Sequence, residues 1–162
     1  MKSACRICEL NASEAALPLR ERLYVNDTWR VAHGWSSLPG WLVVALRRHA
    51  GALDDLTEGE AAALGPILRA ASAALRRVVR CDKTYVMLFA EHPLYLHLPL
   101  HVVPRMPWFD DGDRATAAFW FLDVPEKAQV PPEERERLAE EIGQTMREIL
   151  GEPDTGPAAP LS

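Results

Sequence analysis

The chain has 162 residues, of which 48% are hydrophobic and 25% are charged. This length suits one domain with its own hydrophobic core and is too short to suggest two. A formal net charge of −5 argues against broad electrostatic capture of nucleic acid or of an anionic membrane. No apolar run of about 18 residues is present, so we expect no transmembrane helix. With three cysteines and no apolar segment behind Lys2, we expect a cytoplasmic protein without a disulfide scaffold or a secretory signal.

The predicted elements, taken in chain order, indicate an α+β fold. A hairpin comes first, because two short strand-like runs flank Asn26-Asp27, a pair suited to a tight turn. The third strand is apolar throughout, so we expect both of its faces to be covered. Five strands, with a sixth as an additional candidate, are predicted over residues 22–25, 29–32, 41–46, 84–90, 96–103 and 118–122.

The first long helix is predicted between the third and fourth strands. Thr57 and Glu60 have the spacing of a capping box, and apolar residues then recur at helical intervals as far as Val78. Gly65-Pro66 interrupts this pattern, and we expect a kink or a restart of the helix there.

A second helix is predicted near the C-terminus. It begins near Pro131, carries apolar residues on one stripe and ends at Gly151. Residues 151–162 are rich in Pro, Ala and Gly, so we expect a disordered tail after a single domain over residues 1–150.

The segment from His97 to Arg105 places two histidines on one face of a predicted strand. Alternate side chains of a strand share a face, so His97, Pro99 and His101 point one way. The apolar residues between and after them point the other way, into the core. Two imidazoles so placed can serve one site, or they can be half-buried histidines that only pack.

The Cys5-x-x-Cys8 motif has three interpretations: half of a tetrahedral zinc site, a thioredoxin-like redox pair, or two buried thiols. A redox pair is typical of a helix N-terminus directly after a strand, and no strand precedes this motif. A zinc site needs two more ligands, which the five histidines of the chain would have to supply. Cys81 is expected to be a buried, inert thiol, and His33 to lie on a strand surface.

In combination, these features resemble the histidine-triad (HIT) superfamily of nucleotide-binding proteins, in particular its bacterial branch with an N-terminal Cys-x-x-Cys. That branch has a hairpin, an apolar strand that ends in basic residues and a histidine (here His49), a capped helix, and a strand reading His-φ-His-φ-His-φ-φ-Pro-Arg, where φ is apolar. The resemblance covers roughly residues 5–125. It implies a strongly bent antiparallel sheet of about five strands, one long helix, a C-terminal helix and a homodimer.

The resemblance also implies a zinc site, with Cys5, Cys8, His49 and His97 at the ligand positions. Four protein ligands make a closed site, which is structural by default. Such a site would tie the N-terminus to the end of the third strand and to the start of the triad strand, and it stabilises the fold if the metal prefers the folded state.

The middle position of the triad is occupied by Pro99. In active relatives this position is a histidine that attacks the α-phosphorus of a nucleotide and forms a covalent nucleotidyl-imidazole. Proline has no lone pair for this attack, so the family's covalent hydrolysis is expected to be lost. The segment that donates hydrogen bonds to the phosphate in many relatives here adds the carboxylate of Glu91, which would repel a phosphate.

We therefore expect a zinc-containing HIT-like protein that binds a nucleotide or a related small molecule. The ligand-binding candidates are His101 and the pair Asn26 and Asp27, which falls near the family's ribose-contacting acidic position, although an Asn-Asp turn has its own structural explanation. The alternative is a repurposed hydrolase, lyase or transferase, for example in a biosynthetic pathway. In such an enzyme His101 would act as acid or base, together with Glu91 and His92 or with the zinc. The other interpretation of Glu91 and His92 is that they lie in a solvated loop. A third hypothesis is a structural or regulatory protein with a vestigial pocket.

Overall fold

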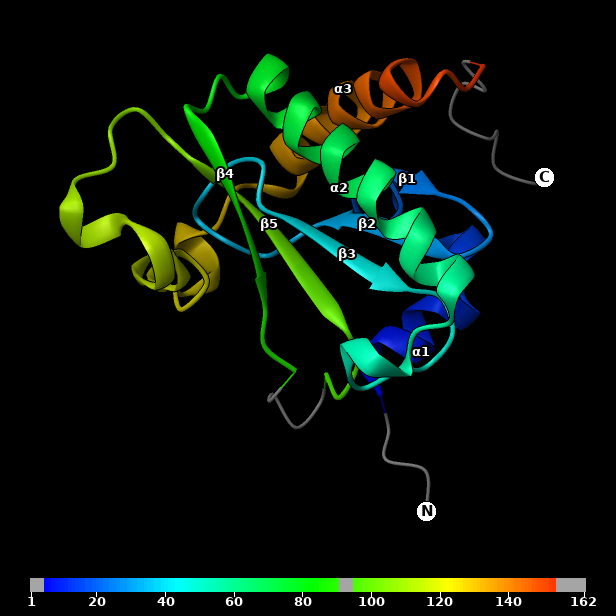
Figure 1. Ribbon diagram of the computed structural model, residues 1–162. Coiled ribbons are helices and arrows are strands. Elements are labelled where there is room, and N and C mark those ends of the chain that lie inside the picture. Colours follow the sequence, from blue (N-terminus) through cyan, green and yellow to red (C-terminus); the bar gives the residue numbers. More distant parts are fainter. Residues whose placement is uncertain (1–4, 91–94, 154–162) are drawn as a thin grey trace.

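The computed structural model describes residues 5–90 and 95–153. Its central element is a five-stranded antiparallel sheet with the strand order β1-β2-β3-β5-β4, and two long helices cover one face of it (Figure 1). This is the α+β architecture predicted from the sequence. The helices and strands are α1 (Arg6–Ala12), β1 (Tyr24–Val25), β2 (Trp29–His33), β3 (Leu42–Leu46), α2 (Glu58–Val78), β4 (Lys83–Leu88), β5 (Pro99–Arg105) and α3 (Pro132–Leu150). Short 3₁₀ helices lie between them, the longest being Ala115–Phe121.

The predicted hairpin is formed by β1 and β2, with Tyr24 opposite Val31. The side-chain oxygen of Asn26 closes its turn by accepting the backbone N–H groups of Thr28 (2.9 Å) and Trp29 (2.7 Å). An asparagine side chain can in this way take the place of a backbone acceptor in a turn. Asn26 therefore has a complete structural role at the tip of this hairpin.

The long helix α2 begins with the predicted capping box. The N–H of Glu60 donates to the Thr57 hydroxyl (3.2 Å), and the N–H of Thr57 donates to the Glu60 carboxylate (2.8 Å). Pro66 lies inside α2, which is a single element, so the expected restart does not occur. The tertiary packing of α2 against the sheet and α3 outweighs the loss of one helical hydrogen bond at the proline.

The main hydrophobic core lies between the sheet and the helices α2 and α3. Leu98, Leu100 and Val102 enter it from alternate positions, as predicted. The strand β5 begins only at Pro99, however, so His97 and Leu98 precede it, whereas the prediction placed both on the strand. From α3 come the predicted apolar residues of its buried stripe, and Gly151 ends this helix in the left-handed conformation at φ 73°. After this helix, Glu152 accepts a hydrogen bond from the Tyr24 hydroxyl (2.7 Å). Most of the predicted tail lies outside the described residues.

The predicted strand over residues 118–122 is wrong, because this segment belongs to the 3₁₀ helix Ala115–Phe121. A short apolar run does not by itself distinguish a strand from a buried helical turn. Here the neighbour of β5 at the sheet edge is β4, and the apolar segment instead packs on the open face of the sheet. Its Phe119 ring meets Trp41 edge-on at 5.4 Å between centroids.

Close contact between α3 and the β1 region depends on Gly143. A Cβ at this position would lie 2.3 Å from the carbonyl oxygen of Leu23. We predict that Gly143→Ala lowers the free energy of unfolding by about 2–4 kcal/mol, because backbone or helix must shift to relieve the overlap. Urea denaturation measures this change. Gly59→Ala in α2 is the matched control, since a Cβ there has no neighbour within 4 Å among the described residues, and it should be neutral or stabilising. Equal stability of the two variants would contradict the prediction.

Candidate functional site

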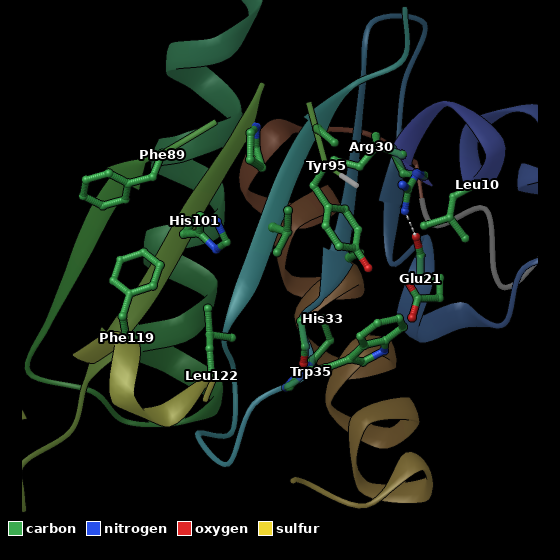
Figure 2. Close-up of a pocket in the computed structure, with 16 residues that line it drawn as sticks. Leu10, Glu21, Arg30, His33, Trp35, Phe89, Tyr95, His101, Phe119 and Leu122 are labelled. Carbon is green, nitrogen blue, oxygen red and sulfur yellow. Dashed lines mark hydrogen bonds between the residues drawn. The ribbon is translucent and has the colours of Figure 1, made fainter. Parts of the chain in front are cut away.

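The face of the sheet opposite α2 and α3 carries a pocket of about 520 Å³. Side chains of β2, β3 and β5 form its floor, with α1 at one end and the segment Ala115–Phe121 at the other (Figure 2). Figure 2 shows the charged residues Arg30 and Glu21 at the end near α1, and the aromatic rings of Phe89 and Phe119 at the opposite end. Most of the lining is apolar, and Pro99 and His101 both belong to it.

A cluster of two thiols and two imidazoles lies beside this pocket. Cys5 is the N-terminal flanking residue of α1 and Cys8 lies one turn later, so the helix start brings both thiols to one side. Their sulfur atoms, with one ring nitrogen each of His49 and His97, all lie within 4.8 Å of one another. These are the four residues that the resemblance implied as metal ligands.

The spacing within the cluster suits a tetrahedral metal ion. The Nδ1 atom of His97 lies 3.6 Å from each sulfur, and Nδ1 of His49 lies 3.3 Å from the Cys8 sulfur. In a tetrahedral zinc site with ordinary Zn–S and Zn–N bonds, the S···N edge is about 3.5 Å. The four donors can therefore hold such an ion with little movement.

The imidazole of His97 is oriented for this role by the backbone. Its Nε2 lies 2.8 Å from the carbonyl oxygen of Leu46, so Nε2–H donates and Nδ1 keeps its lone pair toward the thiols. Burial lowers the pKa of His97, which further favours the neutral, ligating form. A hydrogen bond from the second ring nitrogen to a carbonyl is typical of metal-bound histidines.

His101 lies on the pocket floor, as predicted, and a residue not predicted from the sequence holds it there. The indole Nε1–H of Trp41 donates to its Nδ1 (3.0 Å), and burial lowers the pKa of His101 to about 4. The imidazole is thus neutral near pH 7 and carries its proton on Nε2. In this state it offers a ligand a hydrogen-bond donor.

His33 is buried at 1% exposure, so the expectation of a strand-surface residue is wrong. Its Nε2 accepts the backbone N–H of Gly40 (2.9 Å), which leaves Nδ1–H to donate to the carbonyl of Gly34 (2.9 Å). Burial lowers the pKa of His33 to about 4. This histidine joins the two ends of the connection between β2 and β3, and both of its ring nitrogens are used.

Arg30 and Asn11 are further site residues that the sequence did not single out. Arg30 alternates with Trp29 and Val31 on β2, and this alternation is the signal that places it on the pocket face. Its Nε–H donates to the Asn11 side-chain oxygen (2.7 Å), and the Asn11 amide donates to the carbonyl of Leu46 (3.0 Å).

The other predicted site residues do not join this group. Asn26 closes the β1–β2 turn, Asp27 is exposed beside it, and neither lines the pocket. Glu91 and His92 lie outside the described residues. Of the predicted catalytic and ligand-binding residues that the structure describes, only His101 lines the pocket.

Solved structures of histidine-triad proteins share this arrangement of elements. A HIT-like protein involved in cell-cycle regulation from Bartonella henselae has a TM-score of 0.67 and 19% identity, over 90% of this chain and 98% of the other. A zinc-bound histidine triad family protein from Mycobacterium smegmatis has a TM-score of 0.63 and 19% identity, over 90% and 96%. A hypothetical histidine triad nucleotide-binding protein from Sulfolobus tokodaii has a TM-score of 0.68 and 16% identity, over 90% and 93%. The chain has the histidine-triad fold.

Comparison of the sequence alone finds no relative of this chain. No family model matches the chain, and no curated protein matches it. Among the described residues, no helix is both long and apolar enough to cross a membrane.

The cluster geometry predicts that Cys8→Ser abolishes metal binding. The purified protein should contain roughly one equivalent of metal and the variant almost none, as measured by inductively coupled plasma mass spectrometry. The melting temperature should fall by about 10 °C, which corresponds to a loss of about 3 kcal/mol. Cys81→Ala is the control, because Cys81 is a buried thiol outside the cluster, and it should keep its metal. Full metal content in Cys8→Ser would remove this ligand from the site.

The lowered pKa of His101 predicts a dependence of stability on pH. The unfolded chain takes up the proton near pH 6.5 and the folded chain only near pH 4, so stability falls as the pH drops through this range. The contribution of His101 is up to about 3 kcal/mol. His101→Gln keeps an acceptor for Trp41 but cannot titrate, so urea denaturation should show a smaller loss between pH 7 and pH 4 than in the unmodified protein. Equal losses would show that His101 is not buried in its neutral form.

Proposed function

We propose that this protein binds a small molecule in the pocket of a zinc-stabilised histidine-triad fold and does not hydrolyse nucleotides through a histidine intermediate. The observation that carries the proposal is the pocket floor, where Pro99 and a neutral His101 lie beneath a mostly apolar lining. The pocket volume of about 520 Å³ is that of an ordinary small-molecule site. A nucleotide and an unrelated small molecule both remain ligand classes for this pocket.

Zinc is the metal that the donor set favours. Two thiolates and two imidazoles in a tetrahedral arrangement are typical of structural zinc sites, and a structural neighbour is a zinc-bound protein. In this assignment Cys5, Cys8, His49 and His97 fill the coordination sphere. The ion then cross-links α1, the end of β3 and the segment before β5, and has no open position for a reactant.

The absence of an imidazole at position 99 supports the loss of covalent hydrolysis. The ring nitrogen of Pro99 belongs to an amide bond and has no nucleophilic lone pair. His101 does not replace it as it stands, because its Nδ1 accepts from Trp41 and its Nε2 carries the proton. The same arrangement makes His101 a hydrogen-bond donor to a ligand, and a general base only after the Trp41 contact is broken.

The homodimer implied by the resemblance stays a prediction. The sheet ends at β4, whose outer edge pairs with no strand in residues 5–90 and 95–153. Val86 on this strand is 47% exposed. An open edge with an exposed apolar residue is compatible with a partner subunit there.

We predict that the protein releases no AMP above the buffer background from adenosine phosphoramidate or diadenosine tetraphosphate, as followed by chromatography. Hydrolysis by the unmodified protein would contradict the proposed loss of covalent chemistry. Pro99→His restores the missing imidazole, and Pro99→Ala is the matched control for the loss of the proline ring. Hydrolysis by Pro99→His alone would assign the pocket to nucleotides. Inactivity of both folded variants would favour a ligand of another class.

A further inference from the structure

Arg30 is an unusual residue for the wall of an apolar pocket. It is 3% exposed, and arginine is seldom buried to this extent without a charged partner. Two of its N–H groups are used, by the side-chain oxygen of Asn11 (2.7 Å) and by the backbone carbonyl of Glu21. Neither acceptor is a carboxylate. Within the described part of the chain, no hydrogen bond of its Nη2 group is found, and this group remains for a ligand.

The charge of Arg30 has no ion-pair partner among the described residues. The carboxylates that act on Arg30 are those of Glu21 and Glu14. Glu14 forms an ion pair with Arg47 (3.2 Å), and Glu21 also acts on the buried guanidinium of Arg135. Glu21 thus acts on two guanidinium groups, and Glu136 also acts on that of Arg135. A bound anion would offset the cost of keeping the charge of Arg30 away from water.

The rest of the pocket suits an apolar or aromatic group. At the end away from Arg30, the rings of Phe89 and Phe119 meet edge-on at 5.3 Å, and Leu122 lies beside them (Figure 2). The donor there is the neutral imidazole of His101. Arg30 is the one cationic side chain in the described lining, and Glu21 at the same end is the anionic one. The pocket thus offers one guanidinium to a carboxylate and has no second cation for a polyphosphate.

We propose that the ligand is a monocarboxylate with an apolar or aromatic body, held by Arg30 at its carboxylate and by the Phe89–Phe119 end at its body. This inference rests on the small-molecule role proposed above and names the chemical class. The planar guanidinium matches a carboxylate in geometry as well as in charge. Asn11 acts as a positioning residue, because it fixes the guanidinium through Nε.

Isothermal titration calorimetry of the full-length, metal-loaded protein tests this inference with three matched probes: indole-3-propionate, indole-3-propionamide and tryptamine. The acid should bind more tightly than the neutral amide, and the amine should bind least. Arg30→Met keeps an apolar stem of similar length without the charge. It should weaken binding of the acid by about 10- to 100-fold and leave binding of the amide nearly unchanged.

Three further variants separate recognition from folding. Arg77→Met removes a cation from the exposed surface of α2 and should change neither affinity. Phe119→Ala should weaken the acid and the amide alike, because it removes part of the apolar end. If Arg30→Met does not fold, as judged by circular dichroism, Arg30→Lys takes its place. A lysine keeps the charge without the bidentate geometry, so the preference for the acid over the amide should shrink and not vanish.

The inference is overturned if the amide or the amine binds the unmodified protein as tightly as the acid. It is also overturned if folded Arg30→Met binds the acid without loss, or if the acid does not bind at millimolar concentration. When the amide or the amine binds and Phe119→Ala weakens it, the small-molecule role of the pocket stands and only the carboxylate class fails. When none of the probes and no adenine nucleotide binds, both proposals fail.

Discussion

The carbonyl oxygen of Leu46, at the end of β3, accepts two hydrogen bonds that connect the metal cluster with the pocket. One comes from Nε2 of His97 (2.8 Å) and points the other ring nitrogen toward the thiols. The second comes from the Asn11 amide (3.0 Å), and Asn11 in turn accepts from Arg30. Because this one carbonyl accepts from both His97 and Asn11, it links the position of the Cys/His cluster to that of the charged end of the pocket. A metal ion bound by the four residues of this cluster would therefore also help to fix the geometry of the pocket.

The sheet has two different faces, and β5 shows how one strand serves both. Leu100 and Val102 enter the core beneath α2 and α3, whereas Pro99 and His101 face the pocket. A register shift of one residue would exchange these sets, so burial of the core fixes the pocket floor as well. Pro99 pairs with Ala45 on β3 and lies one residue before Leu100, the first residue of β5 that pairs with β4. Proline is tolerated at the first residue of a strand, so the histidine at this position can be replaced without breaking the sheet.

The sequence was informative where a local pattern and the tertiary structure agree. The alternation in β5, the capping box of α2 and the four-residue metal cluster all follow from short motifs, the last with the help of the resemblance. Prediction failed where distant packing decides, as for residues 118–122, whose apolar run forms a 3₁₀ helix over the open face of the sheet. The prediction for His33 was wrong for a similar reason. Its hydrogen-bond partners Gly34 and Gly40 lie at the two ends of the β2–β3 connection, and only the folded chain brings both to His33. Nor does any local signal reveal that Trp41 and His101, 60 positions apart, share a hydrogen bond.

The polar groups of the pocket are held in place before a ligand arrives. Trp41 fixes the tautomer of His101, while Asn11 and the Glu21 carbonyl fix the guanidinium of Arg30. Ordering a long arginine side chain on binding would cost roughly 0.5–1.5 kcal/mol of conformational free energy. Because the side chain of Arg30 is already ordered in the folded protein, binding would not incur most of this loss. Burial lowers the pKa of Arg30, yet arginine stays charged near neutral pH, so the pocket keeps one cation in an apolar setting. A ligand of the proposed kind would be oriented by the guanidinium of Arg30, and the apolar part of the pocket would select its shape.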